Sequence, residues 1–286
     1  DGSTWSSATA YPLITCAVQG TGTQNSGLAF GGATFPSPSD ESLDNVYLYD
    51  GLTWSADASL SCGRAVAAGN GTQNEAFAAG GVGPAVLNLT EEYCRPFICT
   101  SASCNIVFPS TWSAGGAMII ARRLSGGAGI QNAALLIGGY DGNRTTATEE
   151  YNGSSWSAGG ALAQCRGSLA GAGTQNAGLA FGGEWPGNND AACTEEYDGS
   201  SWSAGGAMIT GRQGLAGYGL QNAALAFAGW AAPTDRACTE EYNGSAWSAG
   251  GALINAGSAM GGFGTQNAGV RAGGTTGPKN ACVEHY

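Results

Sequence analysis

Short apolar runs alternate with glycine-rich and polar turns along the whole chain. In residues 166–183, RGSLAGAGTQNAGLAFGG, two runs of small and apolar residues flank a polar turn at Gln175-Asn176, and Gly182-Gly183 ends the second run. Residues 193–207, CTEEYDGSSWSAGGA, then give a third run, an Asp-Gly turn and a fourth run that carries Trp202. Short runs bounded by such turns predict two β-hairpins, and therefore four strands, in each unit of this kind.

The four-strand unit is repeated six times. Its Gln-Asn pair recurs with the glutamines at Gln24, Gln73, Gln131, Gln175, Gln221 and Gln266. A tryptophan recurs with the same steps, which range from 44 to 58 residues, at Trp5, Trp54, Trp112, Trp156, Trp202 and Trp247. Counting from Trp247 through the two termini to Trp5 also gives 44 residues, so the repeat closes on itself.

Repeats of this length and content predict an all-β fold, a six-bladed β-propeller with four-stranded blades. The ring should be closed by pairing of the N-terminal strand with the C-terminal blade, which splits one blade between the termini. We expect a single domain over residues 1–286 with blades at approximately 13–59, 60–118, 119–162, 163–208, 209–253, and 254–286 plus 1–12. The six tryptophans are expected to be structural residues of the outer strands.

Composition limits the classes of partner that the protein is expected to bind. The chain has 50 glycines, and only 11% of its 286 residues are charged, which agrees with strands and turns rather than long helices. Its 21 acidic and 10 basic residues give a net charge of −11, which is unfavourable for binding nucleic acid. Because the sequence contains no run of eighteen apolar residues, we expect no membrane insertion.

The repeats resemble the kelch repeat. The resemblance rests on an apolar run that ends in Gly-Gly, followed by a tyrosine and, five residues later, a tryptophan, and it covers the whole chain. The Gly-Gly pairs are Gly31-Gly32, Gly80-Gly81, Gly138-Gly139, Gly182-Gly183 and Gly273-Gly274, with Ala228-Gly229 in their place in the fifth unit. The segments also look like kelch-like arrays of marine bacteriophage tail and adhesion proteins. This resemblance implies a recognition scaffold, or less often a copper enzyme similar to galactose oxidase.

The residues give little support for a catalytic function. Copper oxidation needs at least two imidazoles, and the only histidine is His285, so we expect no metal and no cofactor. The segments DGSTW (1–5) and DGLTW (50–54) are similar to a turn motif of six-bladed sialidases but lack one residue of it. Adjacent glutamates such as Glu195-Glu196 point to opposite faces of a strand and cannot flank one glycosidic bond. The protein is therefore not expected to be an enzyme, with a glycosidase as the remaining catalytic alternative.

Four arginines stand nine residues before the repeated glutamine, in the same units that carry Glu-Glu pairs. They are Arg64, Arg122, Arg166 and Arg212, whereas the first and sixth units have Thr15 and Gly257 at this position. Two interpretations remain open. The arginines form partly buried ion pairs with the glutamates, or they form a ring that binds an anionic ligand.

The loops that follow the Gly-Gly pairs vary most between units and carry additional aromatic residues. Blade topology places these loops and the blade-to-blade connections on one face of the disc. Phe35, Tyr140, Trp185 and Trp230 are therefore candidate ligand-binding residues, suited to stacking on sugar rings. The alternative is that they cover the core or make subunit contacts. The Gln-Asn pairs on the other face are interpreted first as turn residues.

Nine cysteines and several glycosylation sequons suggest an extracellular setting. Disulfides such as Cys165 to Cys193 or Cys16 to Cys282 are weighed against buried free thiols, and one disulfide is expected among Cys94, Cys99 and Cys104. Asn70, Asn88 and Asn143 are candidate glycosylation sites. We expect an extracellular or virion-surface module that recognises a surface glycan or receptor without catalysis. The alternative is a structural subunit of a fibre, viral tail or capsid decoration, in contact with copies of itself or with other virion or fibre proteins.

Overall fold

The computed structural model describes residues 2–34, 41–96, 109–187, 189–275 and 280–286, and every regular element in these ranges is a β-strand. The strands form six sheets of four antiparallel strands each. Blade 1 contains β2 (Gln19–Thr23), β3 (Ser26–Phe30), β6 (Val46–Tyr49) and β7 (Trp54–Ala56). Blade 2 contains β8 (Ala68–Gly71), β9 (Glu75–Ala79), β10 (Thr90–Cys94) and β11 (Thr111–Ala114). Blade 3 contains β12 (Gly126–Ile130), β13 (Ala133–Ile137), β14 (Thr148–Tyr151) and β15 (Trp156–Ala158).

The remaining three blades repeat this order. Blade 4 contains β16 (Ala170–Thr174), β17 (Ala177–Phe181), β20 (Thr194–Tyr197) and β21 (Trp202–Ala204). Blade 5 contains β22 (Ala216–Leu220), β23 (Ala223–Phe227), β26 (Thr239–Tyr242) and β27 (Trp247–Ala249). Blade 6 contains β28 (Gly261–Thr265), β29 (Ala268–Ala272), β30 (Val283–His285) and β1 (Ser6–Ser7). Short two-stranded extensions follow β3, β17 and β23, and they are β4–β5 (Ala33–Thr34, Glu41–Ser42), β18–β19 (Glu184–Trp185, Asn189–Asp190) and β24–β25 (Trp230–Ala231, Thr234–Asp235).

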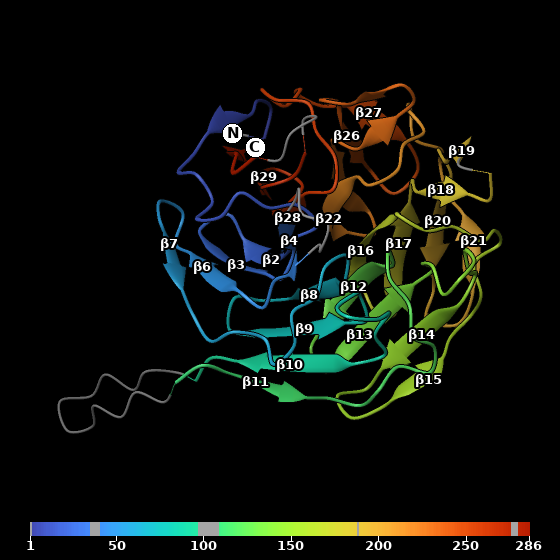
Figure 1. The fold of residues 1–286 in the computed structure, drawn as a ribbon. Coiled ribbons are helices and arrows are strands. Elements are labelled where there is room, and N and C mark those ends of the chain that lie inside the picture. Colours follow the sequence, from blue (N-terminus) through green and yellow to red (C-terminus); the bar gives the residue numbers. More distant parts are fainter. Residues whose placement is uncertain (1, 35–40, 97–108, 188, 276–279) are drawn as a thin grey trace.

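The six sheets stand around a common axis, with the first strand of each blade at the centre (Figure 1). Each central strand contacts the central strands of both neighbouring blades, in the order β2, β8, β12, β16, β22, β28 and back to β2. The predicted six-bladed β-propeller is thus confirmed. Figure 1 also shows the two chain ends side by side.

Blade 6 closes the ring as the repeat spacing predicted. The N-terminal β1 pairs with the C-terminal β30 in antiparallel register, with Ser6 opposite His285 and Ser7 opposite Glu284. Trp5, directly before β1, packs against Phe227 and Tyr286 with ring centroids 5.1 Å away in each case. Strand pairing and aromatic packing therefore both join the two ends of the chain.

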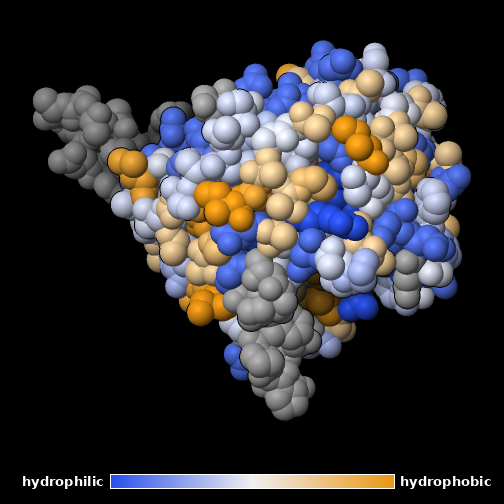
Figure 2. Space-filling model, turned by 90° about the horizontal axis from the view of Figure 1, so that it is seen from above, coloured by the Kyte–Doolittle hydropathy of each residue, from blue (hydrophilic) through white to orange (hydrophobic). Residues whose placement is uncertain are grey.

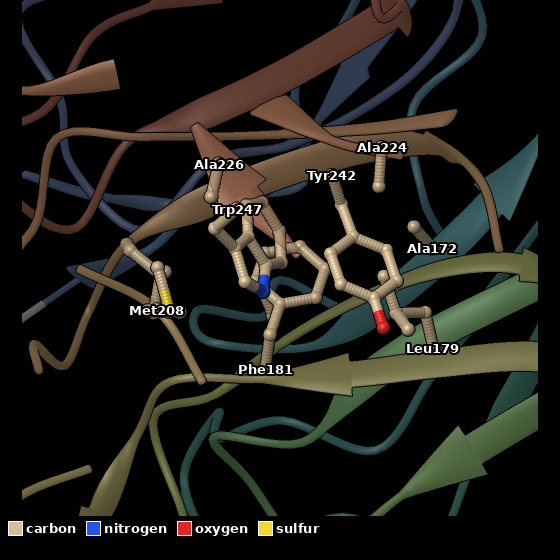
Figure 3. Packing of buried hydrophobic residues seen from close by; sticks show 10 residues of the cluster. Ala172, Leu179, Phe181, Met208, Ala224, Ala226, Tyr242 and Trp247 are labelled. Atoms are coloured by element: carbon tan, nitrogen blue, oxygen red, sulfur yellow. The ribbon is translucent and has the colours of Figure 1, made fainter. Parts of the chain in front are cut away.

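Hydrophobic side chains fill the spaces between neighbouring blades. Between blades 4 and 5, Leu179 and Phe181 of β17 meet Tyr242 and Trp247 of blade 5, with Met208 from the connection between the blades (Figure 3). The Phe181 and Trp247 rings lie 5.0 Å apart. Equivalent clusters occupy the other blade interfaces. The core is therefore divided into layers between sheets, which holds the faces of the disc rigid for any site built on them.

A ring of main-chain hydrogen bonds surrounds the axis just before the central strands. In the segment before its central strand, each blade has one residue at an equivalent position with φ between 49° and 58°. These residues are Ala17, Val66, Leu124, Ser168, Gly214 and Ala259. Each donates its N–H to the carbonyl of the equivalent residue in the preceding blade, at 2.7–3.4 Å, and Ala17 donates to Ala259, so that the six bonds form a closed cycle. The cycle relies on no side chain, which is why six residues of different size occupy it.

A search of the described residues finds no helix long and apolar enough to span a bilayer.

Candidate functional site

Strand order gives the disc two different faces. The Gln-Asn turns and the Asp-Gly or Asn-Gly turns lie together on one face, which we call the turn face. The loops between the second and third strands and the blade-to-blade connections lie on the other, the loop face. At the turn face, Gly51, Gly153, Gly199 and Gly244 have φ between 87° and 96°, which explains why glycine follows Asp or Asn in each turn.

On the loop face, blades 4 and 5 carry two adjacent hairpins. Trp185 pairs with Asn189 in the first hairpin and Trp230 pairs with Asp235 in the second. Asp190 joins the two hairpins, because its carboxylate accepts hydrogen bonds from the Ala232 N–H at 3.1 Å and from Gln213 Nε2 at 3.2 Å. The two extensions are thus held in fixed positions relative to each other.

The same surface continues into blade 3. Arg144 forms an ion pair with Glu184 of the first hairpin, at 2.6 Å and with both side chains largely buried. Tyr140 bridges to both Arg123 and Arg144 through the main chain, and the Arg123 guanidinium lies 5.4 Å from the centre of the Tyr140 ring. The loops of blades 3 to 5 therefore form one connected surface, which we call the braced patch.

The aromatic candidates differ in how much they expose. Trp230 is 39% exposed, whereas Trp185 and Tyr140 are half-buried. The indole Nε1 of Trp185 is buried and lies near the Cys193 thiol. Phe35 lies outside the described residues. The structure brings Tyr140, Trp185 and Trp230 to one face, and Trp230 offers the most surface for stacking.

The four repeated arginines are buried ion-pair partners. Arg64, Arg122, Arg166 and Arg212 are at most 1% exposed. They bind the first glutamate of each Glu-Glu pair in their own blade, which is Glu91, Glu149, Glu195 and Glu240 respectively. The predicted ion pairs are present, and they are more deeply buried than expected. A ring of arginines open to an anionic ligand does not fit these contacts, because the guanidinium groups have no accessible surface.

Blade 6 has the same ion pair from a different strand, which the sequence did not reveal. Arg271 lies in β29 and binds Glu284 at 2.5 Å, with its side chain fully buried. Gly257 occupies the position of the missing arginine, and a Cβ atom there would lie 2.7 Å from the Thr275 main-chain oxygen and 3.0 Å from Arg271 Nη2. A glycine at this position therefore leaves room for the guanidinium that arrives from the neighbouring strand. In blade 1, Thr15 and Tyr47 replace the pair.

The second glutamate of each pair bonds the next blade. Glu92, Glu150, Glu196 and Glu241 accept the tyrosine hydroxyls of Tyr151, Tyr197, Tyr242 and Tyr286, at 2.5–2.6 Å. Burial and this bond raise the pKa of Tyr151, Tyr242 and Tyr286 to about 12. Adjacent glutamates thus point in opposite directions, as expected, and both are engaged in holding the ring together.

His285 continues this tyrosine series. Its Nε2 lies 2.8 Å from the Tyr49 hydroxyl, at the place where the other blades use the second glutamate. Burial lowers the pKa of His285. In the remaining interface, Tyr93 donates to Asp57 at 2.5 Å. Six tyrosines therefore each contact a polar side chain of the preceding blade.

The repeated tryptophans and glutamines also join neighbouring blades. Trp156, Trp202, Trp247 and Trp5 donate through Nε1 to a threonine of the preceding blade at 2.8–3.0 Å. Trp112 Nε1 is buried without a partner, because Val46 stands where the others have threonine. Gln73, Gln175, Gln221 and Gln266 donate to two main-chain carbonyls of the preceding blade. Their role as turn residues was predicted, and their cross-blade bonds were missed.

The remaining chemical candidates are placed as follows. Asp50 accepts the N–H groups of Thr53 and Leu52, which lowers its pKa, so the DGLTW segment forms a hairpin turn; Asp1 of DGSTW lies outside the described residues. Within the described part of the chain no group of His, Cys, Asp and Glu could hold a metal ion. Asn88 and Asn143 are exposed, whereas Asn70 lies on the wall of the central channel.

The suggested disulfides are absent. Neither Cys165 with Cys193 nor Cys16 with Cys282 forms a bond, and no other pair does so among the cysteines within the described ranges. Cys193 Sγ instead lies 2.7 Å from Arg166 Nη1, and burial raises the pKa of this thiol. Sequence spacing could not distinguish a thiol that packs on an arginine from a bridged one. Cys94 is exposed, and Cys99 and Cys104 lie outside the described residues.

Comparison with known proteins adds no relative. No protein-family model and no curated protein matches this chain, so it is identified by its architecture alone, as a six-bladed β-propeller.

Proposed function

We propose that the protein is a non-catalytic, kelch-like recognition module that binds a surface glycan or another receptor through its loop face. It works outside the cell or on a virion, in line with the resemblance of its repeats to bacteriophage adhesion proteins. The observation that carries the proposal is the braced patch, in which a partly exposed Trp230 is fixed beside polar side chains by contacts between three blades.

The bracing matters because it makes the patch preorganised. Binding orders flexible side chains at a free-energy penalty, and a surface already held by hydrogen bonds and ion pairs avoids much of it. Asp190 holds the patch through its hydrogen bond with Ala232, and Glu184 holds it through its ion pair with Arg144. An exposed indole next to carboxylate and amide groups offers a stacking plane together with hydrogen-bond partners, which suits a sugar ring.

The repeated acids support a recognition role over a glycosidase. Most glycosidases need two carboxyl groups facing one bond at a separation of about 5–9.5 Å, and sialidases replace one of them with a tyrosine nucleophile. Here the first glutamate of each pair binds a buried arginine and the second binds a tyrosine of the next blade, as with Glu195 and Glu196. These residues stabilise the ring and are not directed into a shared cleft.

A glycan array tests the proposal. The wild-type protein should bind a defined class of glycans, and Trp230→Ala should weaken that binding at least about tenfold, which corresponds to about 1.4 kcal/mol of stacking. Leu52→Ala is the matched control, because Leu52 is 75% exposed but lies in a turn on the opposite face. The proposal would be contradicted if the wild type binds no glycan or cell-surface receptor. It would also be contradicted if Trp230→Ala and Trp185→Ala both bind as tightly as the wild type.

A structural role in a fibre or virion is the second candidate, and exposed isoleucines favour it. Ile119, Ile209 and Ile254 occupy one repeated position on the loop face and are 56–61% exposed. Figure 2, turned by 90° from the view along the axis in Figure 1, looks at the rim of the disc, where hydrophobic residues form small separate groups among hydrophilic ones. Sedimentation and electron microscopy would support this role if discs associate through the loop face and Ile209→Asp disperses them. A wild-type protein that remains monomeric at high concentration would exclude self-association through this face.

A further inference from the structure

The central channel contains a chamber that the recognition surface does not use. A cavity of about 430 Å³ lies between the central strands and extends to the Gln-Asn turns, so it opens on the turn face. A smaller cavity of about 90 Å³ lies at the cycle of main-chain hydrogen bonds toward the loop face. The two cavities share Gln19, Ser125, Leu169, Leu215 and Met260, which form the collar between them.

Main-chain groups dominate the wall of the chamber. All six central strands have glycine at alternate positions, such as Gly171 and Gly173 in β16. Thr72 donates its N–H to Glu75 O at 2.7 Å across the Gln73-Asn74 turn, so the residues that flank this turn form a hydrogen-bonded pair. By alternation, the glycines lie at non-hydrogen-bonded positions and turn their N–H and C=O groups away from the second strand, toward the axis. Without side chains, these groups are accessible to a molecule in the channel, except at Gly71, whose N–H and C=O bond to Asn70 Oδ1 and to the Thr21 hydroxyl.

The side chains that line the chamber are uncharged. The described lining residues include no Asp, Glu, Lys, Arg or His, in a protein with a net charge of −11. Polar side chains are contributed by Thr21, Asn70 and Thr174, and the collar contributes apolar Leu169 and Leu215. A charged ligand would lose hydration here without gaining an opposite charge, whereas a neutral ligand could exchange hydrogen bonds with water for hydrogen bonds with the wall.

Asn70 gives the wall a specific donor. Its Oδ1 accepts a hydrogen bond from the Gly71 N–H at 2.8 Å and lies 3.3 Å from the Thr21 hydroxyl, which also bonds to Gly71 O at 2.7 Å. The bond from Gly71 identifies the acceptor end of the amide and leaves Nδ2 as the donor of a residue that lines the chamber. The other blades have alanine, threonine or an aromatic residue at this position, so none of them offers an amide group there.

We propose that this chamber binds a small, uncharged, hydroxyl-rich molecule of the size of a monosaccharide, entering from the turn face. The chamber volume lies within the range of about 300–1,000 Å³ that is typical of small-molecule sites. Hydroxyl groups can pair with both the N–H and the C=O groups of the glycine wall, and the C–H side of a pyranose ring can rest on the Leu169 and Leu215 side chains. This site is independent of the braced patch, which lies on the opposite face.

Ligand-observed and protein-observed NMR titrations with neutral hexoses test the proposal. Galactose, glucose and mannose serve as probes, and galacturonate and galactosamine serve as charged controls of the same size. At least one neutral hexose should bind with a Kd of about 1 mM or tighter and shift amide resonances of the chamber glycines. The charged controls should bind at least about tenfold more weakly, the factor that 1.4 kcal/mol produces.

Two variants locate the site. Asn70→Asp keeps the acceptor for the Gly71 N–H but removes the Nδ2 donor, and Thr174→Trp narrows the mouth at an exposed position. Each should weaken hexose binding at least about tenfold, whereas Leu52→Trp, on the same face but outside the chamber, and Trp230→Ala should leave it unchanged. The proposal is overturned if no neutral hexose binds, if the charged sugars bind equally, or if a folded Asn70→Asp or Thr174→Trp variant binds like the wild type.

Discussion

Single residues in this ring have tasks that depend on which side of a strand they occupy. In each Glu-Glu pair, the first carboxylate neutralises a buried arginine of its own blade and the second accepts a tyrosine hydroxyl of the next blade, as Glu149 and Glu150 do. The alternation of side chains along a strand produces this division. Where a blade lacks a residue of the repeated pattern, another residue takes over its contact, as Arg271 and His285 do, or the partner remains without a hydrogen bond, as Trp112 Nε1 does.

Trp112 is the unpaired group, and we expect Val46→Thr to correct it. The new hydroxyl would stand where Thr90, Thr148, Thr194 and Thr239 accept a tryptophan Nε1. Satisfying a buried donor should raise the free energy of unfolding by about 1 kcal/mol, measured by chemical denaturation. The reverse change, Thr90→Val, should leave Trp156 Nε1 without its acceptor and lower the free energy of unfolding by about 1–3 kcal/mol. If both variants shift stability in the same direction, the contact has been misassigned.

Arg271 and Gly257 offer a swap that tests the displaced ion pair. Arg271→Ala alone leaves Glu284 buried without its cation and should lower the free energy of unfolding by about 3–5 kcal/mol. Adding Gly257→Arg supplies a cation from the position used in blades 2 to 5, but its Cβ would lie 2.7 Å from the Thr275 main-chain oxygen, so it should recover only part of that loss in thermal unfolding. A double variant no more stable than Arg271→Ala would show that Gly257 does not stand in for the arginine position.

His285 should make ring closure sensitive to mild acid. Burial lowers the pKa of His285 in the folded protein, so the unfolded chain takes up the proton first as pH falls. Its contribution to stability is therefore present above the unfolded value of about 6.5 and is lost as pH falls from there toward the folded value. The pH dependence of unfolding between about pH 7 and 5 should be flatter in His285→Gln than in the wild type, and an equal slope would contradict this.

At the scale of elements, the hairpin turns act as connectors between blades. Gln221 Nε2 donates to Gly178 O at 3.0 Å and to Tyr197 O at 2.8 Å, both in the preceding blade. Gln131 differs, because it contacts Glu92 at 3.4 Å. A turn that had been interpreted as local chemistry therefore also fixes the distance between two sheets.

Gln221→Ala should consequently destabilise the protein more than Gln131→Ala. Loss of two well-formed bonds to buried carbonyls is expected to lower the free energy of unfolding by about 1–3 kcal/mol, and loss of the longer contact by less than about 1 kcal/mol. Hydrogen exchange should accelerate at the interface of blades 4 and 5 in the first variant. Equal effects of both substitutions would argue against a cross-blade role.

The sequence predicted the elements well because each strand and turn is encoded locally and repeated. The four strands of each blade and the closure of the ring followed from spacing within the chain, which also indicated the Arg–Glu pairs of blades 2 to 5 as one of two interpretations. Arg271 was missed because it reaches the same place from another strand, and the position-by-position comparison found only Gly257. The braced patch and the chamber could not be read either, since they arise where loops and strands of different blades meet in space.

At the scale of the whole molecule, closure of the ring depends on the pairing of the N-terminal β1 with the C-terminal β30. Trp5→Ala removes its packing on Phe227 and Tyr286 and its bond to Thr239, and should lower stability by about 3–5 kcal/mol. Trp247→Ala is the matched control, because Trp247 is equally buried inside an uninterrupted blade. Hydrogen exchange of β30 and β1 should accelerate with Trp5→Ala and not with Trp247→Ala. Identical exchange maps would show that closure does not rely on Trp5.

The cycle of main-chain hydrogen bonds around the axis has a consequence for how such a chain can evolve. Its circumference is set by six peptide units in left-handed geometry, each bonded to the one before it. Deletion of a repeat would break two of these bonds and insertion of a duplicate would break one, and either would change the diameter of the cycle, whereas a point mutation other than one to proline keeps the N–H that each bond needs. The number of blades is therefore protected by the backbone, while the side chains around it remain free to diversify.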